Sequence, residues 1–119
     1  MFSLGDSNRY LLYSEPTDMR KSFNTLSGIV TNVMGLNPHN GDVFIFINKS
    51  RNRIKLLHWE PGGMVLYCKM LERGTFSVPN SSTDTSSYLM QWRDLVLMVE
   101  GIMEKPQSRK ERLDMLKTM

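Results

Sequence analysis

The chain has 119 residues, a length that predicts one domain with a modest hydrophobic core and is too short for two. Its 15 Lys and Arg residues against 12 Asp and Glu give a net charge of +3, which by itself selects no class of partner. The single cysteine excludes an internal disulfide, the first residues lack signal-peptide features, and no apolar run approaches the roughly 20 residues of a membrane span, so we expect a cytoplasmic protein.

The N-terminal part is predicted to form a strand and then a helix. RYLLY at 9–13 is a short strand-like run that ends at the turn residues 15–18. Apolar residues then recur at steps of three and four, which predicts a helix with Thr17 or Asp18 as its N-cap and Gly35 at its end. The apolar stripe of this helix comprises Met19, Phe23, Leu26, Val30 and Val33.

Three strands are expected next. VFIFI at 43–47 is β-branched or aromatic at every position, which is typical of a central strand buried on both faces. KSRN at 49–52 predicts a hairpin tip, 54–59 a second strand, and the turn residues 60–63 lead to a third strand at 64–71. Because the connections are short, these strands should form an antiparallel meander.

The C-terminal part is predicted to hold a second helix and a basic tail. A Ser- and Thr-rich connector at 80–87 provides the N-cap of the helix, and Gly101 ends it. Its apolar stripe comprises Leu89, Trp92, Leu95, Val96 and Val99. Residues 103–119 supply +2 of the net charge, and Ser108 with Glu111 forms a capping-box pattern that predicts a short helix. We therefore predict one domain over residues 1–102 and a basic tail over 103–119.

The predicted order is strand, helix, three strands, helix and tail. This order indicates an α+β fold in which a small antiparallel β-meander sheet is packed by two helices over one face.

Residue types suited to catalysis or metal binding are few. His39 lies in a polar turn and should be solvated, whereas His58 lies on a strand and should be half buried with a hydrogen bond. Cys68 shares a strand face with three apolar residues, which predicts a small core residue and not a reactive thiol. Those neighbours are Met64, Leu66 and Met70. One cysteine and two separated histidines fit no zinc pattern, and no glycine-rich phosphate loop is present. We therefore expect no cofactor and no enzymatic activity; a hydrolase would require scattered carboxylates to converge in one pocket.

Cations around the first hairpin tip favour contact with nucleic acid. Lys49, Arg51, Arg53 and Lys55 occupy every second position, and no acid lies among residues 43–59. Such a basic finger could lie along a phosphate backbone and release counterions, with hydrogen-bond donors between its cations. These donors are Asn48, Ser50 and Asn52. The alternative interpretation is a solvated hairpin tip whose charges only keep the protein soluble, and the sequence supports both interpretations equally.

Arg20 and Lys21 form a second basic feature, because they are predicted in the first turn of the first helix. The positive helix end disfavours each of them by a few tenths to about 1 kcal/mol. Two cations at a helix start would attract a phosphate, and a violated local rule often marks a functional site. The alternative is that Arg20 pairs with Glu15, Asp18 or a sheet carboxylate, and that Lys21 is solvated.

Three segments of the chain carry a family resemblance. They are PTDMRKSF at 16–23, FIFINKSRNRIKLLHWE at 44–60 and KMLERGTF at 69–76. In this order they resemble the small accessory protein encoded by the second reading frame of insertion sequence 66 type bacterial transposons. The resemblance covers most of residues 7–102, although Ser22 stands where many relatives have Gly and His58 where an aromatic is common. It implies an accessory role in transposition beside a separate, larger transposase that cuts the DNA.

The resemblance favours DNA as the partner and brings Arg73 into the candidate site. Our leading hypothesis is a non-catalytic factor that contacts phosphates through Arg20, Lys21, Lys49, Arg51, Arg53, Lys55 and Arg73. The alternative is an adaptor that binds the transposase or another element-encoded protein through Trp59 and the tail residues Leu113 and Leu116. RNA binding ranks lower, because the second helix has no cation before Arg93, unlike the double-stranded RNA-binding domain of similar order.

Overall fold

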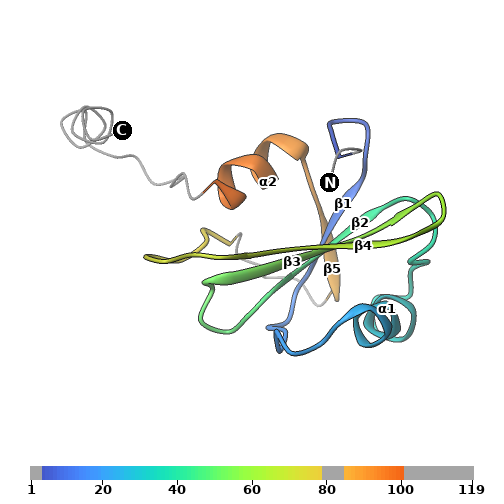
Figure 1. The fold of residues 1–119 in the computed structure, drawn as a ribbon, viewed down its shortest axis with the longest axis horizontal. Coiled ribbons are helices and arrows are strands. Elements are labelled where there is room, and N and C mark those ends of the chain that lie inside the picture. The colour runs from blue at the N-terminus through green and yellow to red at the C-terminus, as the bar shows by residue number, and fades with distance from the viewer. Residues whose placement is uncertain (1–3, 79–84, 101–119) are drawn as a thin grey trace.

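The computed structural model describes residues 4–78 and 85–100, and it shows five strands and two helices in these ranges (Figure 1). The elements are β1 Tyr10–Tyr13, α1 Phe23–Asn32, β2 Val43–Ile47, β3 Arg53–Glu60, β4 Gly63–Met70, β5 Ser87–Met90 and α2 Trp92–Val99. The predicted α+β fold is confirmed. The expected end of the second helix at Gly101 and the tail helix lie outside the described residues.

The five strands form one sheet in the order β4-β3-β2-β1-β5. Strands β2, β3 and β4 are antiparallel neighbours, which confirms the predicted meander. β1 runs parallel to β2, because α1 carries the chain back to the start of the sheet between them. The register places Lys55 opposite Cys68 and Arg53 opposite Met70 on the last hairpin.

Strand β5 replaces the first turn of the predicted second helix. Its residues pair with β1 in antiparallel register, with Leu12 opposite Tyr88. Leu89, expected in the helical stripe, lies on this strand with 64% of its surface exposed. The helix starts later, with Gln91 as its N-cap. Pairing prevails over the helical spacing because β5 satisfies the backbone groups on the free edge of β1.

The two helices cover opposite faces of the sheet, which corrects the expectation that both lie over one face (Figure 1). Alternate side chains of β2 point to opposite sides, and all five are buried. The α1 side of the core contains Leu11, Leu26, Val30, Met34, Phe44, Phe46 and Leu57. The α2 side contains Tyr10, Leu12, Val43, Ile45, Ile47, Ile54, Leu56, Phe76, Met90, Leu95 and Met98. A strand that is apolar at every position needs cover on both faces, and one helix supplies each.

Helix α1 begins later than the apolar spacing predicts. Its N-cap is Ser22 and its buried residues are Leu26 and Val30, whereas Phe23 and Val33 are 42% and 52% exposed. Thr17 and Asp18 are therefore not N-caps. The helix ends as predicted: Gly35 has a φ of 68°, and the Leu36 N–H donates to the Val30 carbonyl oxygen at 2.9 Å.

Candidate nucleic-acid interface

The segment between β1 and α1 forms a turn that holds both predicted N-terminal cations outside the helix. The Asp18 carboxylate accepts the Arg20 backbone N–H at 2.9 Å, and the Asp18 carbonyl oxygen accepts the Lys21 N–H at 3.1 Å. An Asp side chain that captures nearby backbone in this way competes with helix formation. Arg20 and Lys21 consequently precede the N-cap, and the predicted conflict with the first helical turn is absent from this segment.

Arg20 forms an ion pair with Asp18, as the alternative hypothesis stated. Its Nη2 donates to Oδ2 at 2.7 Å, and its Nε lies 3.1 Å from both carboxylate oxygens. The hydrogen bonds from Arg20 lower the pKa of Asp18 to about 2, and the Asp18 carboxylate raises the pKa of Arg20. Both side chains are exposed, so the pair fixes the direction of the guanidinium more than it stabilises the fold.

The tip of the β2–β3 hairpin is built around Asn48. Its Oδ1 accepts the backbone N–H groups of Asn52 and Arg53, each at 3.0 Å, and its Nδ2 donates to the Asn52 side chain at 2.7 Å. These amides were predicted to meet phosphate but are used inside the tip. Arg51 takes a positive φ of 57°, and its carbonyl oxygen accepts the Phe76 N–H at 2.6 Å. The backbone of the tip is therefore held by contacts on both sides.

Cations from the turn and from the hairpin tip meet in one open hollow of about 540 Å³, which we call the basic hollow. It is lined by Pro16, Thr17, Asp18, Met19, Arg20, Asn48, Lys49, Ser50 and Arg53. Asp18 is the one acid among the described lining residues, and it is paired with Arg20. No acid of this lining is therefore left to compensate the charges of Lys49 and Arg53. Thr17 also lines the basic hollow and is buried. Its hydroxyl has no hydrogen-bond partner among the residues described.

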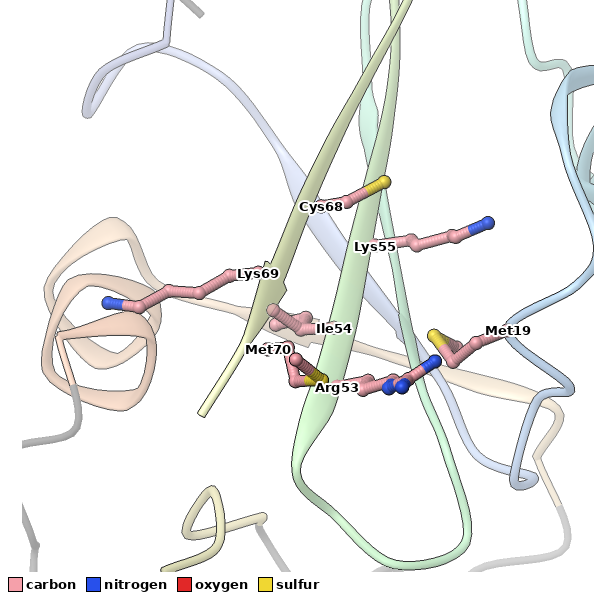
Figure 2. A pocket seen from close by; sticks show the side chains of 7 residues that line it. All are labelled: Met19, Arg53, Ile54, Lys55, Cys68, Lys69 and Met70. Atoms are coloured by element: carbon pink, nitrogen blue, oxygen red, sulfur yellow. The ribbon is translucent and has the colours of Figure 1, made fainter. Parts of the chain in front are cut away.

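A second hollow of about 340 Å³, which we call the methionine hollow, adjoins the first and shares Met19 and Arg53 with it (Figure 2). The other lining residues are Ile54, Lys55, Cys68, Lys69 and Met70. The Lys55 ammonium donates to the Lys21 carbonyl oxygen at 2.6 Å, which ties β3 to the turn before α1. Lys69 points the opposite way in Figure 2 and donates to the Val99 carbonyl oxygen at 2.6 Å, so its charge belongs to the α2 side.

Cys68 and Met70 were missed as site residues. The strand alternation places Cys68 on a face with Met64, Leu66 and Met70 as predicted, but Cys68 is exposed and Met70 is 58% exposed. The prediction of a core cysteine is therefore wrong. Helix α1 packs over one part of this face and leaves the end near the hairpin tip uncovered, a limit that strand periodicity does not encode.

The remaining predicted residues that the structure describes do not line the two hollows. Arg51 lines a third hollow beside Tyr13 and Val78, which shares Pro16, Asn48 and Lys49 with the basic hollow. The charge of Arg51 partly offsets the rise that burial gives to the pKa of Tyr88. Arg73 is exposed in the loop after β4, and Lys21 contributes its carbonyl oxygen. Trp59 is half-buried, with the His39 ring edge-on at 5.1 Å between centroids. Leu113 and Leu116 lie outside the described residues.

The two histidines lie outside the linings of the basic hollow and the methionine hollow. His39 is exposed, as predicted, and His58 is more buried than expected, with 5% exposure and its Nδ1 3.5 Å from the Asp42 carbonyl oxygen. Within residues 4–78 and 85–100, no three His, Cys, Asp or Glu side chains gather to hold a metal ion. Neither of the helices described there has the length and apolar character of a membrane span.

The whole surface described above falls inside one family match. The family model for "IS66 Orf2 like protein" matches residues 8–109, which confirms the resemblance carried by the three segments. The protein y4jC of Sinorhizobium fredii (strain NBRC 101917 / NGR234) is 34% identical over 71 residues, which cover 60% of this chain and 61% of that protein. The protein y4hO of the same strain is 33% identical over 81 residues, covering 68% and 70%.

No solved structure shows a significant match to the chain. Since the family model extends from before β1 to beyond α2, the chain belongs to the IS66 Orf2-like family, and this membership supports an accessory role in transposition.

Proposed function

We propose that the protein is a non-catalytic DNA-binding accessory factor of transposition that acts beside a separate transposase. The observation that carries this proposal is the meeting of Arg20, Lys49, Arg53 and Lys55 on the α1 side of the sheet, in two adjoining hollows. These residues come from the turn before α1, the hairpin tip and β3, so the fold and not the local sequence brings them together. The proposal implies a cytoplasmic protein, because bacterial DNA lies there.

Phosphate contact is the chemistry that suits this surface. Lys and Arg gain affinity for DNA by displacing condensed counterions, and this gain is independent of base sequence. The surface offers charged side chains and no helix start, so it is suited to backbone contact more than to base readout. Arg51 and Arg73 lie outside the two hollows and would contribute only if the DNA extends past the tip.

The test is a fluorescence-anisotropy titration of labelled DNA with the wild-type chain and two charge-reversal variants. Arg53→Glu should weaken binding by about tenfold, because it removes a phosphate contact and adds repulsion. The matched control is Arg93→Glu, which makes the same charge change at an exposed position of α2 on the opposite side of the sheet. Equal losses in both variants, or no loss in either, would contradict a defined interface on the α1 side.

An adaptor function has a separate observation in its favour. β4 is an outer strand of the sheet, eight residues long, with Cys68 and Met70 exposed. A long outer strand with exposed apolar side chains can accept a strand from another protein. This function predicts co-purification with the transposase that persists in high salt and after nuclease treatment. Loss of the complex in either condition would favour DNA as the bridge.

A further inference from the structure

The basic hollow and the methionine hollow form one continuous surface of two different chemical characters. Lys49 and Arg53 give the first an excess of positive charge, and Met19, Met70 and Cys68 give the second sulfur-rich apolar walls. Arg53 and Met19 line both hollows, so a ligand group in one hollow is adjacent to a group in the other. Figure 2 shows these two residues among the side chains that line the methionine hollow.

The apolar part of this surface is open to solvent, although α1 covers another part of the same sheet face. Leu57 is fully buried under α1, while Met70 on the same face is 58% exposed. Among the described residues, the lining of the methionine hollow contains no acid and includes three cations. Arg53 and Lys55 lie beside the apolar walls, whereas Lys69 points to α2 and donates to the Val99 carbonyl oxygen. A ligand that fits both features carries negative charge beside a flat apolar group.

A nucleotide with an unpaired base has this combination. Thioether sulfur makes favourable contacts with aromatic rings, and a guanidinium stacks on the face of a base. In duplex DNA the bases are stacked inside the helix, so a duplex would place phosphates in the basic hollow and leave the methionine hollow unfilled. In single-stranded DNA a base can leave the stack and lie against protein side chains.

We propose that this surface binds single-stranded DNA, with a phosphate at Lys49 and Arg53 and the adjoining unpaired base against Met19 and Met70. This inference rests on the proposed function, because it specifies which form of DNA the site takes. The recognition is by stacking and charge, so it is tolerant of base identity.

The only cysteine of the chain supplies a direct reporter, since Cys68 lines the methionine hollow and is exposed. The rate at which 5,5′-dithiobis(2-nitrobenzoate) reacts with Cys68 is measured alone and with saturating DNA of three kinds. These are an oligothymidylate single strand, an abasic strand of equal length and a duplex with the same number of phosphates. The proposal expects clear protection by the thymidylate strand and much less by the abasic strand and the duplex. Equal protection by all three would overturn it.

Variants give an independent readout by anisotropy. Met70→Ala should weaken binding of the thymidylate strand by roughly fivefold and leave binding of the abasic strand and the duplex almost unchanged. Leu89→Ala is the matched control, because Leu89 is an equally exposed apolar residue on β5 at the other edge of the sheet. Circular dichroism checks that both variants fold.

The failures of the two proposals are distinguishable. If neither the single strand nor the duplex binds, the DNA-binding function itself is wrong. If both bind and lose affinity in Arg53→Glu, but neither Met70→Ala nor removal of the bases changes single-strand affinity, the function stands and the unpaired-base site is wrong.

Discussion

The Arg20 guanidinium lines the basic hollow and already forms an ion pair with Asp18. Asp18 and a DNA phosphate are therefore alternative partners for the same cation. The pKa of Asp18 falls to about 2, so this carboxylate stays charged at any pH at which DNA binding would be measured. A carboxyl group with a lowered folded-state pKa adds stability above its unfolded pKa, and this contribution is lost as the pH falls through about 2. At neutral pH a phosphate that approaches Arg20 must therefore compete with Asp18.

Removing that competition should strengthen DNA binding. Asp18→Asn keeps a side-chain oxygen for the Arg20 backbone N–H but loses the charge that holds the guanidinium. We expect duplex DNA to bind about two- to fivefold more tightly at low salt, measured by anisotropy. Asp94→Asn, which makes the same charge change in the first turn of α2, should have a smaller effect. Weaker binding by Asp18→Asn would indicate that Arg20 acts by fixing the turn and does not contact phosphate.

At the scale of elements, the hairpin tip is the part whose local chemistry decides the site. Asn48 supplies one acceptor to two backbone N–H groups, and Arg51 takes a left-handed conformation that a non-glycine residue rarely adopts. Lys49 and Arg53 consequently share the basic hollow, whereas Arg51 lines a neighbouring hollow together with Lys49. The predicted basic finger has its four cations at every second position, but a tight turn does not preserve the two-residue period of a strand.

Truncating the central amide of the tip should destabilise the protein. Asn48→Ala removes three hydrogen bonds and is expected to lower the free energy of unfolding by about 1 to 2 kcal/mol, measured by urea denaturation. Ser50→Ala, at an exposed neighbouring position, should change it by less than about 0.5 kcal/mol. Equal stability of the two variants would show that the tip holds its shape without the Asn48 network.

The elements that the sequence predicted correctly are those whose signals are local. The apolar run 43–47 predicts a buried strand, and the Pro and Gly residues at 60–63 predict a tight turn between the next two strands. These two local signals were enough to predict the meander. β5 was missed because its partner, β1, is more than seventy residues away and Leu89 also fitted a helical spacing. The opposite placement of the helices was implied by the all-apolar strand itself, since a strand buried on both faces needs two layers.

At the scale of the whole molecule, four of the predicted cations lie on one side of the sheet. Arg20, Lys49, Arg53 and Lys55 lie with α1, while Lys69 on the other side is tied to the end of α2. The modest net charge of +3 therefore understates the local field that a DNA strand would meet on the α1 side. The sequence hypothesis named these cations as one set, but three separate segments supply them, so their spacing along the chain could not show which of them line the same hollow.

The size of this surface predicts its response to salt. If the four cations each neutralise at most one phosphate, the logarithm of the duplex binding constant should fall with the logarithm of salt concentration with a slope between about −2 and −4. Arg53→Ala should reduce the magnitude of the slope by about 1, whereas Arg93→Ala should leave it unchanged. A slope far steeper than −4 would mean that other cations, such as those of the basic tail, take part.

The segment after β4 returns to the hairpin tip and is fastened there by the Leu71 N–H to the Asn52 carbonyl oxygen, by the Phe76 N–H to Arg51, and by the burial of the Phe76 ring. The tip of the β2–β3 hairpin is thus held in place by a second segment of the chain, the one that follows β4. A synthetic peptide spanning only residues 43–70 would lack these contacts. Grafting that hairpin onto a foreign scaffold would therefore transfer its sequence but not the conformation of its tip.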